Sequence, residues 1–226
     1  MKPEPLFFRI GDLVLYRNNQ LIAFNKPATL PVLSDKTQDK PLLALAEIYC
    51  HTRLYPVHRI DRPASGIVLF ARTKQAASAL NEQFQNRSIR KTYLAVVSEL
   101  PATPEGTLIH FLEKNAQQNR SIAYPDERPN ALRAELHYRH LDSIDRYHLL
   151  EIELLTGRHH QIRAQLAAIG CPIKGDDKYG AKRGNRDRSI HLHAWKLAFD
   201  HPVSGEREEI VAPIPEEKVW QAFSWQ

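Results

Sequence analysis

The sequence contains little cysteine and no long apolar run, and both absences restrict what the protein can be. Its two cysteines, Cys50 and Cys171, lie far apart and form no CxxC pair. We therefore expect buried free thiols of a reducing cytosol rather than a disulfide framework. No apolar run approaches the roughly 20 residues that a membrane-spanning helix needs. Residues 1–17 lack the apolar core and cleavage site of a secretory signal. These absences favour a cytoplasmic protein that does not cross a membrane.

The composition is that of an ordinary globular chain. Of its 226 residues, 42% are hydrophobic and 25% are charged, and this length is sufficient to bury a core. Internal repeats, low-complexity tracts and coiled-coil heptads are missing. We expect one domain over residues 1–226, in which residues 1–20 form a short extension.

The positive charge is concentrated in one stretch. The net charge is +5, and residues 158–188 hold eight lysines or arginines against three aspartates, which equals the whole excess. A local basic surface attracts phosphate backbones by Coulomb force and by counterion release. A solvated charged loop has the same composition, so the charge is compatible with RNA as a partner and with a plain surface loop.

Apolar periodicity predicts more strands than helices. Strands are expected at residues 11–24 (two strands around a turn at 18–19), 67–70, 92–97, 147–154, 191–199 and 208–211. Helices are expected at residues 74–87, with Thr73 as the N-cap, and at residues 160–169, ended by Gly170. Residues 115–130 have the composition of an exposed loop. The predicted fold class is α+β, with a mixed, largely antiparallel sheet flanked by helices.

The densest polar segment is HRIDRPASG at residues 58–66, immediately before a buried strand. It places Asp61 between Arg59 and Arg62. Neighbouring positive charge favours the carboxylate, so Asp61 should stay ionised and available as a nucleophile or base. A proline and a glycine give the segment an irregular backbone, which suits a loop that orients side chains. A surface salt bridge in a turn is the alternative interpretation.

A second segment, TGRHHQIR at residues 156–163, leaves a strand through a glycine turn and enters a helix. Arg158, His160 and Arg163 lie near the start of that helix, where backbone N–H groups already favour anions. Cations at this end are electrostatically unfavourable unless they bind a carboxylate or a phosphate. The alternative is an ordinary amphipathic helix.

Together these segments resemble the RluA-type pseudouridine synthases of rRNA and tRNA. HRIDRPASG is similar to the family's catalytic loop, usually HRLDxxTSG, and TGRHHQIR is similar to its TGRxHQ(I/L)R. Further strings in the family's order and approximate spacing are NKP at 25–27, RKTY at 90–93, CPIKGD at 171–176, KYG at 178–180 and LHA at 192–194. The resemblance covers residues 22–213, and seven strings in order are far more specific than any one of them.

The resemblance implies roles for particular residues. Asp61 matches the catalytic aspartate, Tyr93 the tyrosine that packs on the target base, and Arg163 the arginine paired to that aspartate. Arg59 matches the position that fills the gap left by the extruded nucleotide, and Leu192 an apolar wall residue. The residues expected to bind substrate RNA are Arg59, Arg62, Arg158, His160, Lys174, Arg183 and Leu192.

The resemblance also implies the pseudouridine synthase fold, with a catalytic cleft in its middle, and the isomerisation of uridine to pseudouridine in structured rRNA or tRNA. Uracil is detached from ribose, rotated and reattached through carbon. One carboxylate can serve this reaction, and no metal or other cofactor is expected. We expect the protein to act as a monomer.

Two other functions compete with this one. A catalytically inactive RNA-binding protein of the same fold would not need Asp61, Tyr93 and Arg163 together, because phosphate binding requires none of them. A metal-dependent hydrolase is suggested by the eleven histidines. No HxxxH with a carboxylate is present, however, and a zinc site should supply three clear ligands.

Overall fold

A computed structural model describes residues 8–35, 37 and 39–225 of the chain. The chain divides into two compact units. The first unit comprises residues 1–89 and 194–213, and the second comprises residues 90–193 and 214–226. The chain thus crosses from one unit to the other three times. The single catalytic domain expected over residues 1–226 stays a prediction.

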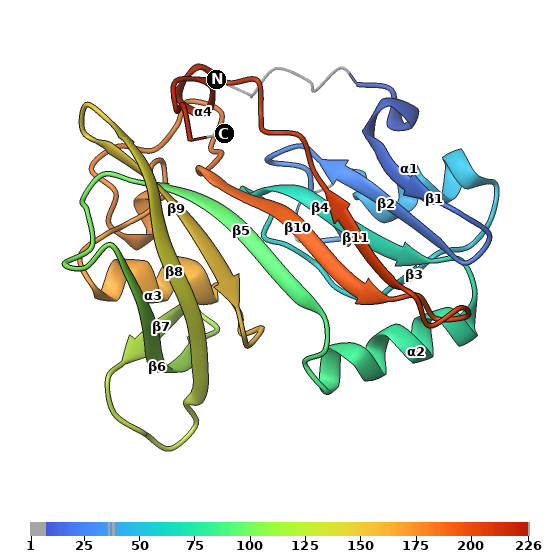
Figure 1. Ribbon diagram of the computed structural model, residues 1–226, viewed down its shortest axis with the longest axis horizontal. Coiled ribbons are helices and arrows are strands. Elements are labelled where there is room, and N and C mark those ends of the chain that lie inside the picture. Colours follow the sequence, from blue (N-terminus) through green and yellow to red (C-terminus); the bar gives the residue numbers. More distant parts are fainter. Residues whose placement is uncertain (1–7, 36, 38, 226) are drawn as a thin grey trace. The chain divides into compact units, whose positions relative to one another are not determined.

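The first unit contains one part of the β-sheet (Figure 1). Its strand order is β1 (Val14–Arg17), β2 (Leu21–Lys26), β4 (Ser65–Ala71), β10 (Leu192–Asp200, which belongs to this unit from Ala194 on) and β11 (Arg207–Val211). Strand β3 (Tyr55–Pro56) also pairs with β4. The β1–β2, β2–β4, β3–β4 and β10–β11 pairs are antiparallel. Asn18 forms the predicted turn between β1 and β2, because its Oδ1 accepts hydrogen bonds from the N–H groups of Gln20 and Leu21, both at 2.8 Å.

Helices complete the first unit. They are η1 (Ile10–Leu13), α1 (Leu42–Cys50) and α2 (Lys74–Gln85). Thr73 is the predicted N-cap of α2, since its Oγ1 accepts from the N–H of Ala76 at 3.2 Å. The buried face of α2 packs its Leu80 against sheet residues such as Leu69 and Phe199 in one hydrophobic cluster. This packing places the start of β4, and the loop before it, on a rigid support.

The second unit contains strands that follow one another in the order β5 (Arg90–Val97), β9 (Tyr147–Leu154), β8 (Leu132–Ile144), β6 (Glu105–Asn115) and β7 (Arg120–Tyr124). All four neighbouring pairs are antiparallel. Its helices are α3 (Gln161–Ala168), η2 (Asp177–Tyr179) and α4 (Lys218–Gln221). Ala164 of α3 and Tyr179 of η2 pack with Leu112 and Ala134 of the sheet, so α3 lies against the strands, as Figure 1 shows.

The expected α+β class is confirmed, but one prediction of local structure is wrong. Residues 115–130 are not a continuous loop, because Arg120–Tyr124 forms strand β7. This strand pairs with β6 in the register Leu112↔Ala123. The polar composition of the segment predicted a loop, whereas the hydrogen bonds that make it a strand come from its partner across the turn.

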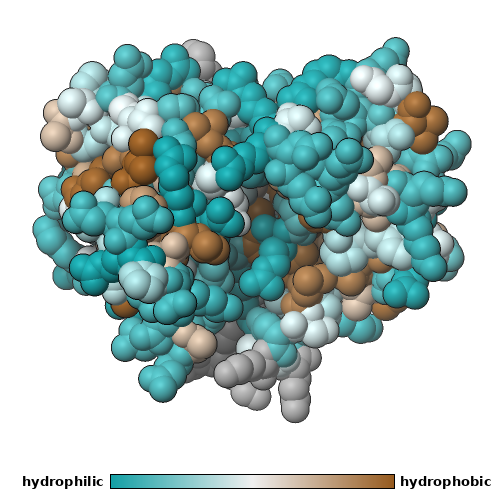
Figure 2. All heavy atoms as spheres, turned by 90° about the horizontal axis from the view of Figure 1, so that it is seen from below, coloured by the Kyte–Doolittle hydropathy of each residue, from teal (hydrophilic) through white to brown (hydrophobic). Residues whose placement is uncertain are grey.

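The surface and the cysteines agree with the composition. Hydrophilic residues cover most of the face drawn in Figure 2. Cys50 and Cys171 are buried free thiols, as expected, and burial raises the pKa of both. Within the described part of the chain, no helix is both long enough and apolar enough to span a bilayer.

Gly66 gives a test of the packing at the start of β4. Its φ is +110°, and a Cβ atom there would lie 2.6 Å from the backbone nitrogen of Ala194 in β10. Gly66→Ala should therefore lower the free energy of unfolding by about 3 kcal/mol or more, from left-handed strain and overpacking together. Urea unfolding measures the change.

The control is Gly205→Ala in the same unit. Gly205 has φ +72° and would meet no atom within 4 Å, so only the backbone strain of about 1–2 kcal/mol applies. Equal losses of unfolding free energy for the two variants would show that the close approach of β10 to Gly66 adds no destabilisation beyond the backbone strain.

Candidate active site

The candidate residues are distributed over both units. Asp61, Arg59 and Arg62 belong to the first unit, whereas Tyr93 and Arg163 belong to the second. The other residues expected to bind RNA also lie in the second unit, namely Arg158, His160, Lys174, Arg183 and Leu192. Each unit therefore contributes its own local arrangement of charged side chains.

The loop that carries Asp61 turns tightly and is bound to the segment after β2. The N–H of Ala64 donates to the carbonyl of Asp61 at 3.1 Å, which closes a turn around Pro63. The N–H of Thr29 donates to the carbonyl of Arg62 at 2.8 Å. At the end of the loop, Gly66 pairs with Lys26 of β2. The backbone from Asp61 to Gly66 is thereby fixed.

Lys26 ties these two segments together from inside. Its side chain is fully buried. Its Nζ has three N–H groups to donate and lies within hydrogen-bond distance of four carbonyl oxygens, those of Pro27, Leu30, Arg62 and Ala64, at 3.0, 2.8, 3.1 and 2.6 Å. Burial lowers the pKa of Lys26 to about 7, against the attraction of the Asp61 carboxylate, which favours the ammonium. Lys26 therefore holds the loop that carries Asp61 through hydrogen bonds to its backbone, and its amino group also interacts with the charge of Asp61.

Arg62 binds the first unit from the solvent side. Its Nη1 lies 2.9 Å from Oδ2 of Asp35 and donates to Oγ1 of Thr37 at 2.7 Å, and its Nη2 forms a salt bridge with Asp39. A hydrogen bond from Thr37, followed by the charge of Arg62, lowers the pKa of Asp35. A phosphate that binds Arg62 would have to share this guanidinium with protein carboxylates. Its role in RNA binding stays a prediction.

The second motif forms the start of α3. Gln161 organises the turn before the helix, since its Oε1 accepts from Thr156 Oγ1 at 2.7 Å and from the N–H of Arg158 at 3.0 Å. His160 is the N-cap residue and has a left-handed φ of +52°. Its ring stacks on that of His159, with centroids 3.8 Å apart. The expected strand, glycine turn and helix are confirmed.

Arg163 lies in the buried face of α3, with 4% of its surface exposed. Its Nε and Nη2 donate to Oδ2 and Oδ1 of Asp176 at 2.7 and 2.8 Å. The guanidinium carbon lies 4.9 Å from the ring centroid of Tyr179. Sequence reasoning missed both partners, although each falls in a family string, CPIKGD or KYG.

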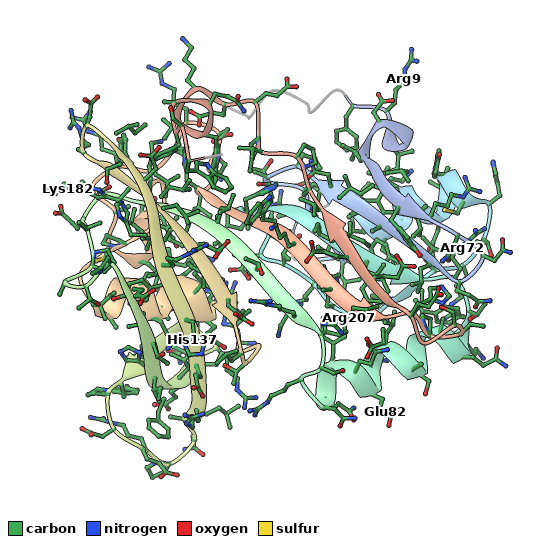
Figure 3. All side chains as sticks on the ribbon, in the orientation of Figure 1. Arg9, Arg72, Glu82, His137, Lys182 and Arg207 are labelled. Carbon is green, nitrogen blue, oxygen red and sulfur yellow. The ribbon has the colours of Figure 1, made fainter. Side chains whose placement is uncertain are left out.

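The remaining candidates differ in exposure. Tyr93 lies on β5 opposite Ile152 of β9 and is partly exposed. Lys174 is partly buried, which lowers its pKa, and its Nζ donates to Asn185 at 3.1 Å. Leu192 is buried at the start of β10. Arg183 is exposed, in the same loop as Lys182, which Figure 3 labels at the left of the view.

The histidines take structural partners. His191 lies 2.9 Å from Glu217 and stacks on Trp220, and burial lowers its pKa. His159 lies 3.0 Å from Ser121 Oγ. Among the described residues, no group of three or more His, Cys, Asp or Glu side chains is placed to bind a metal ion.

The order of the strands, the loop before β4 and the motif at α3 define a class of RNA-modifying proteins. The sequence model of the RNA pseudouridylate synthase family matches residues 20–168. The chain belongs to this family, and relatives named tRNA pseudouridine synthase C and ribosomal large subunit pseudouridine synthase D make it an RluA-type member.

Individual relatives support this assignment. A protein of Chloroflexus aurantiacus, named an uncharacterized RNA pseudouridine synthase, is 43% identical over 162 residues, covering 70% of this chain and 49% of that protein. tRNA pseudouridine synthase C of Haemophilus ducreyi is 30% identical, and the match covers 94% of this chain and 96% of that protein. The chain spans about half the length of the Chloroflexus protein and of a Bacillus subtilis relative.

Solved structures agree with the fold. The human protein RNA pseudouridylate synthase domain containing 4 has a TM-score of 0.76 at 25% identity, covering 93% of this chain and 92% of that chain. Human RNA pseudouridylate synthase domain containing 1 has the same TM-score at 24% identity. The pseudouridine synthase fold expected from the sequence is therefore confirmed.

Lys26→Met tests the internal tie of the Asp61 loop. Methionine fills a similar volume but donates no hydrogen bond, so the carbonyls lose this donor, and only that of Arg62 keeps the N–H of Thr29 named above. We expect the free energy of unfolding to fall by about 1–3 kcal/mol for each carbonyl left unsatisfied. Urea unfolding measures the loss, and Lys74→Met on the exposed side of α2 is the control that should change little.

The same pair of proteins tests the pKa of Lys26. Between a folded pKa of about 7 and the ordinary 10.5, the unfolded chain binds more protons than the folded chain. Lys26 therefore makes the free energy of unfolding rise with pH across that window, by up to about 1.4 kcal/mol per pH unit. Below the window both states hold the proton, so Lys26 causes no pH dependence there. Lys26→Met should lose this part of the slope. Identical slopes between pH 7 and 9 would contradict the lowered pKa.

Proposed function

We propose that this chain isomerises specific uridines of structured rRNA or tRNA to pseudouridine, with Asp61 as the catalytic carboxylate. The observation that carries this proposal is the family match over residues 20–168, which includes both the Asp61 loop and the motif at α3. Relatives named for tRNA and for large-subunit rRNA support both classes of substrate.

The reaction needs no outside reactant, because its atoms balance within the uridine. The bond between uracil N1 and ribose C1′ breaks, a bond from C5 to C1′ forms, and the proton that leaves C5 is replaced by one on N1. Asp61 can promote this by attacking the anomeric carbon, by adding to the ring, or by removing a ribose proton. Glycosidases use paired carboxylates because they must also activate water. Here the detached base is its own nucleophile.

Tyr93 and Arg163 serve the same reaction in this proposal. The ring of Tyr93 supports the detached uracil, and its hydroxyl can assist proton transfer. The guanidinium of Arg163 supplies a positive countercharge for the catalytic carboxylate. No metal ion has a role in these steps.

Substrate binding combines base flipping with phosphate contacts. A uridine inside a stem must leave the stack, at a cost of a few kcal/mol. Arg59, two residues before Asp61, can stack its planar guanidinium where the base was. The basic stretch of residues 158–188 binds the backbone, and its cations at positions 182, 183, 186 and 188 are exposed. A catalytically inactive RNA-binding protein would retain only the phosphate contacts.

Asp61→Asn tests the central role. An amide neither attacks carbon nor carries the required charge, so we expect a normally folded protein without turnover. Release of tritium from RNA labelled at uridine C5 measures the reaction, and thermal unfolding verifies the fold. Tritium release at a rate near that of the unchanged protein would rule out Asp61 as the catalytic group.

A pair of arginine variants separates catalysis from binding. Arg163→Ala should lower kcat more than RNA affinity, because it removes a countercharge. Arg183→Ala should weaken binding and reduce its salt dependence by about one phosphate contact, while kcat at saturation is preserved. Tritium release at several RNA and salt concentrations distinguishes the two. Interchanged behaviour would show that the two arginines have been assigned the wrong roles.

A further inference from the structure

We propose that Asp176, together with the ring of Tyr179, is a positioning residue that orients Arg163 for the reaction. This inference rests on the proposed function, since it gives Arg163 a part in turnover. It adds a requirement of its own: the orientation of Arg163 is set within the second unit, by a carboxylate from the segment that follows α3.

The carboxylate of Asp176 determines the plane and direction of the guanidinium. The two hydrogen bonds from Arg163, at 2.7 and 2.8 Å, are parallel and bidentate. Such a pair fixes a planar group more strictly than a single contact does. Asp176 has 1% of its surface exposed and Arg163 has 4%, so water screens this pair little. The pair uses two of the five N–H donors of the guanidinium.

The ring of Tyr179 contacts the same guanidinium. Its centroid lies 4.9 Å from the guanidinium carbon, within the range of a cation–π contact. The hydroxyl of Tyr179 accepts from the N–H of Ser121 at 2.7 Å and lies 3.0 Å from Nδ1 of His160. The ring therefore cannot rotate away without losing these hydrogen bonds.

The segment around Asp176 forms a tight turn that holds Asp176 and Tyr179 close together. Gly175 has φ +86°, and a Cβ atom there would lie 2.9 Å from the carbonyl oxygen of Ser189. The carbonyl of Asp176 accepts from the N–H groups of Tyr179 and Ala181 at 3.1 and 3.0 Å. Because Asp176 and Tyr179 are held on one short turn, their positions relative to Arg163 are coupled.

A purely structural ion pair is the simpler interpretation, because the contact also joins this turn to α3. Buried pairs are weak sources of net stability, since desolvation offsets their attraction. A displacement of about 1 Å in a catalytic group, by contrast, can cost about 100-fold in rate. The two interpretations therefore differ in what a conservative change at Asp176 does to kcat.

Asp176→Asn keeps the shape but lets the side chain accept through one oxygen only. We expect kcat for tritium release to fall about 10- to 100-fold, with KM changed less than about threefold, since ground-state binding is untouched. The matched control is Asp177→Asn, the same change one residue along the chain at an exposed position, which should leave kcat unchanged. A loss confined to KM or to thermal stability would overturn the proposal.

A double-variant cycle tests whether Asp176 acts through Arg163. In an Arg163→Lys background, Asp176→Asn should cause little further loss of kcat, because the planar group that it orients is gone. Full additivity would mean that Asp176 acts independently, and the proposal would be wrong.

Asp176→Glu decides the case if the Asn variant does not fold. It preserves the charge but extends the side chain by one methylene, so the protein should fold and still lose kcat. An Asp176→Glu variant with unchanged kcat, or one that also fails to fold, would make the pair structural and reject the proposal. Failure of the proposed function itself is recognised separately: Asp61→Asn or Arg163→Ala would then retain turnover.

Discussion

The geometry around Asp61 depends on the contacts between the buried amino group of Lys26 and four backbone carbonyls. A cation without water is costly unless every direction around it supplies an acceptor. Here four carbonyls do so, two from the segment after β2 and two from the loop of residues 58–66. Neither segment can move without exposing the charge to an apolar environment. The loop is further bound on its solvent side, where Arg62 contacts Asp35 and Asp39.

The second unit also buries a basic side chain, and there a carboxylate rather than a set of carbonyls accepts its hydrogen bonds. Arg163 is buried by α3, and Asp176 neutralises it at two hydrogen bonds. Both units therefore surround a buried cation with acceptors from an irregular segment that glycine permits, Gly66 in one and Gly175 in the other. The ion pair of Arg163 with Asp176 contributes little net stability of its own, so stability does not account for both arrangements. Their consequence is orientation, which suits a reaction that depends on one correctly placed carboxylate.

The strings that resemble the family thus fall into two groups. Those around Asp61, Tyr93 and Arg163 supply the proposed chemistry. The lysine of NKP, the aspartate of CPIKGD and the tyrosine of KYG contact the loop or the side chain that they position. The glutamine of TGRHHQIR, Gln161, likewise binds the turn before α3. A motif string therefore records structural requirements as well as chemical ones.

What the sequence alone determined is what local periodicity and side-chain chemistry encode. The α+β class, the strands around residues 67–70 and 147–154, and the capped helix α2 follow from alternation, helical spacing and a threonine cap. The candidate Asp61 follows from its charged neighbours and from the resemblance. Tertiary structure decided the rest. Strand β7 exists because β6 pairs with it across a turn. Lys26 binds carbonyls, which every residue carries and no sequence pattern distinguishes. Arg163 meets Asp176 only because the chain turns back after α3, and the sequence does not specify which of many possible carboxylates such a turn brings to a buried arginine.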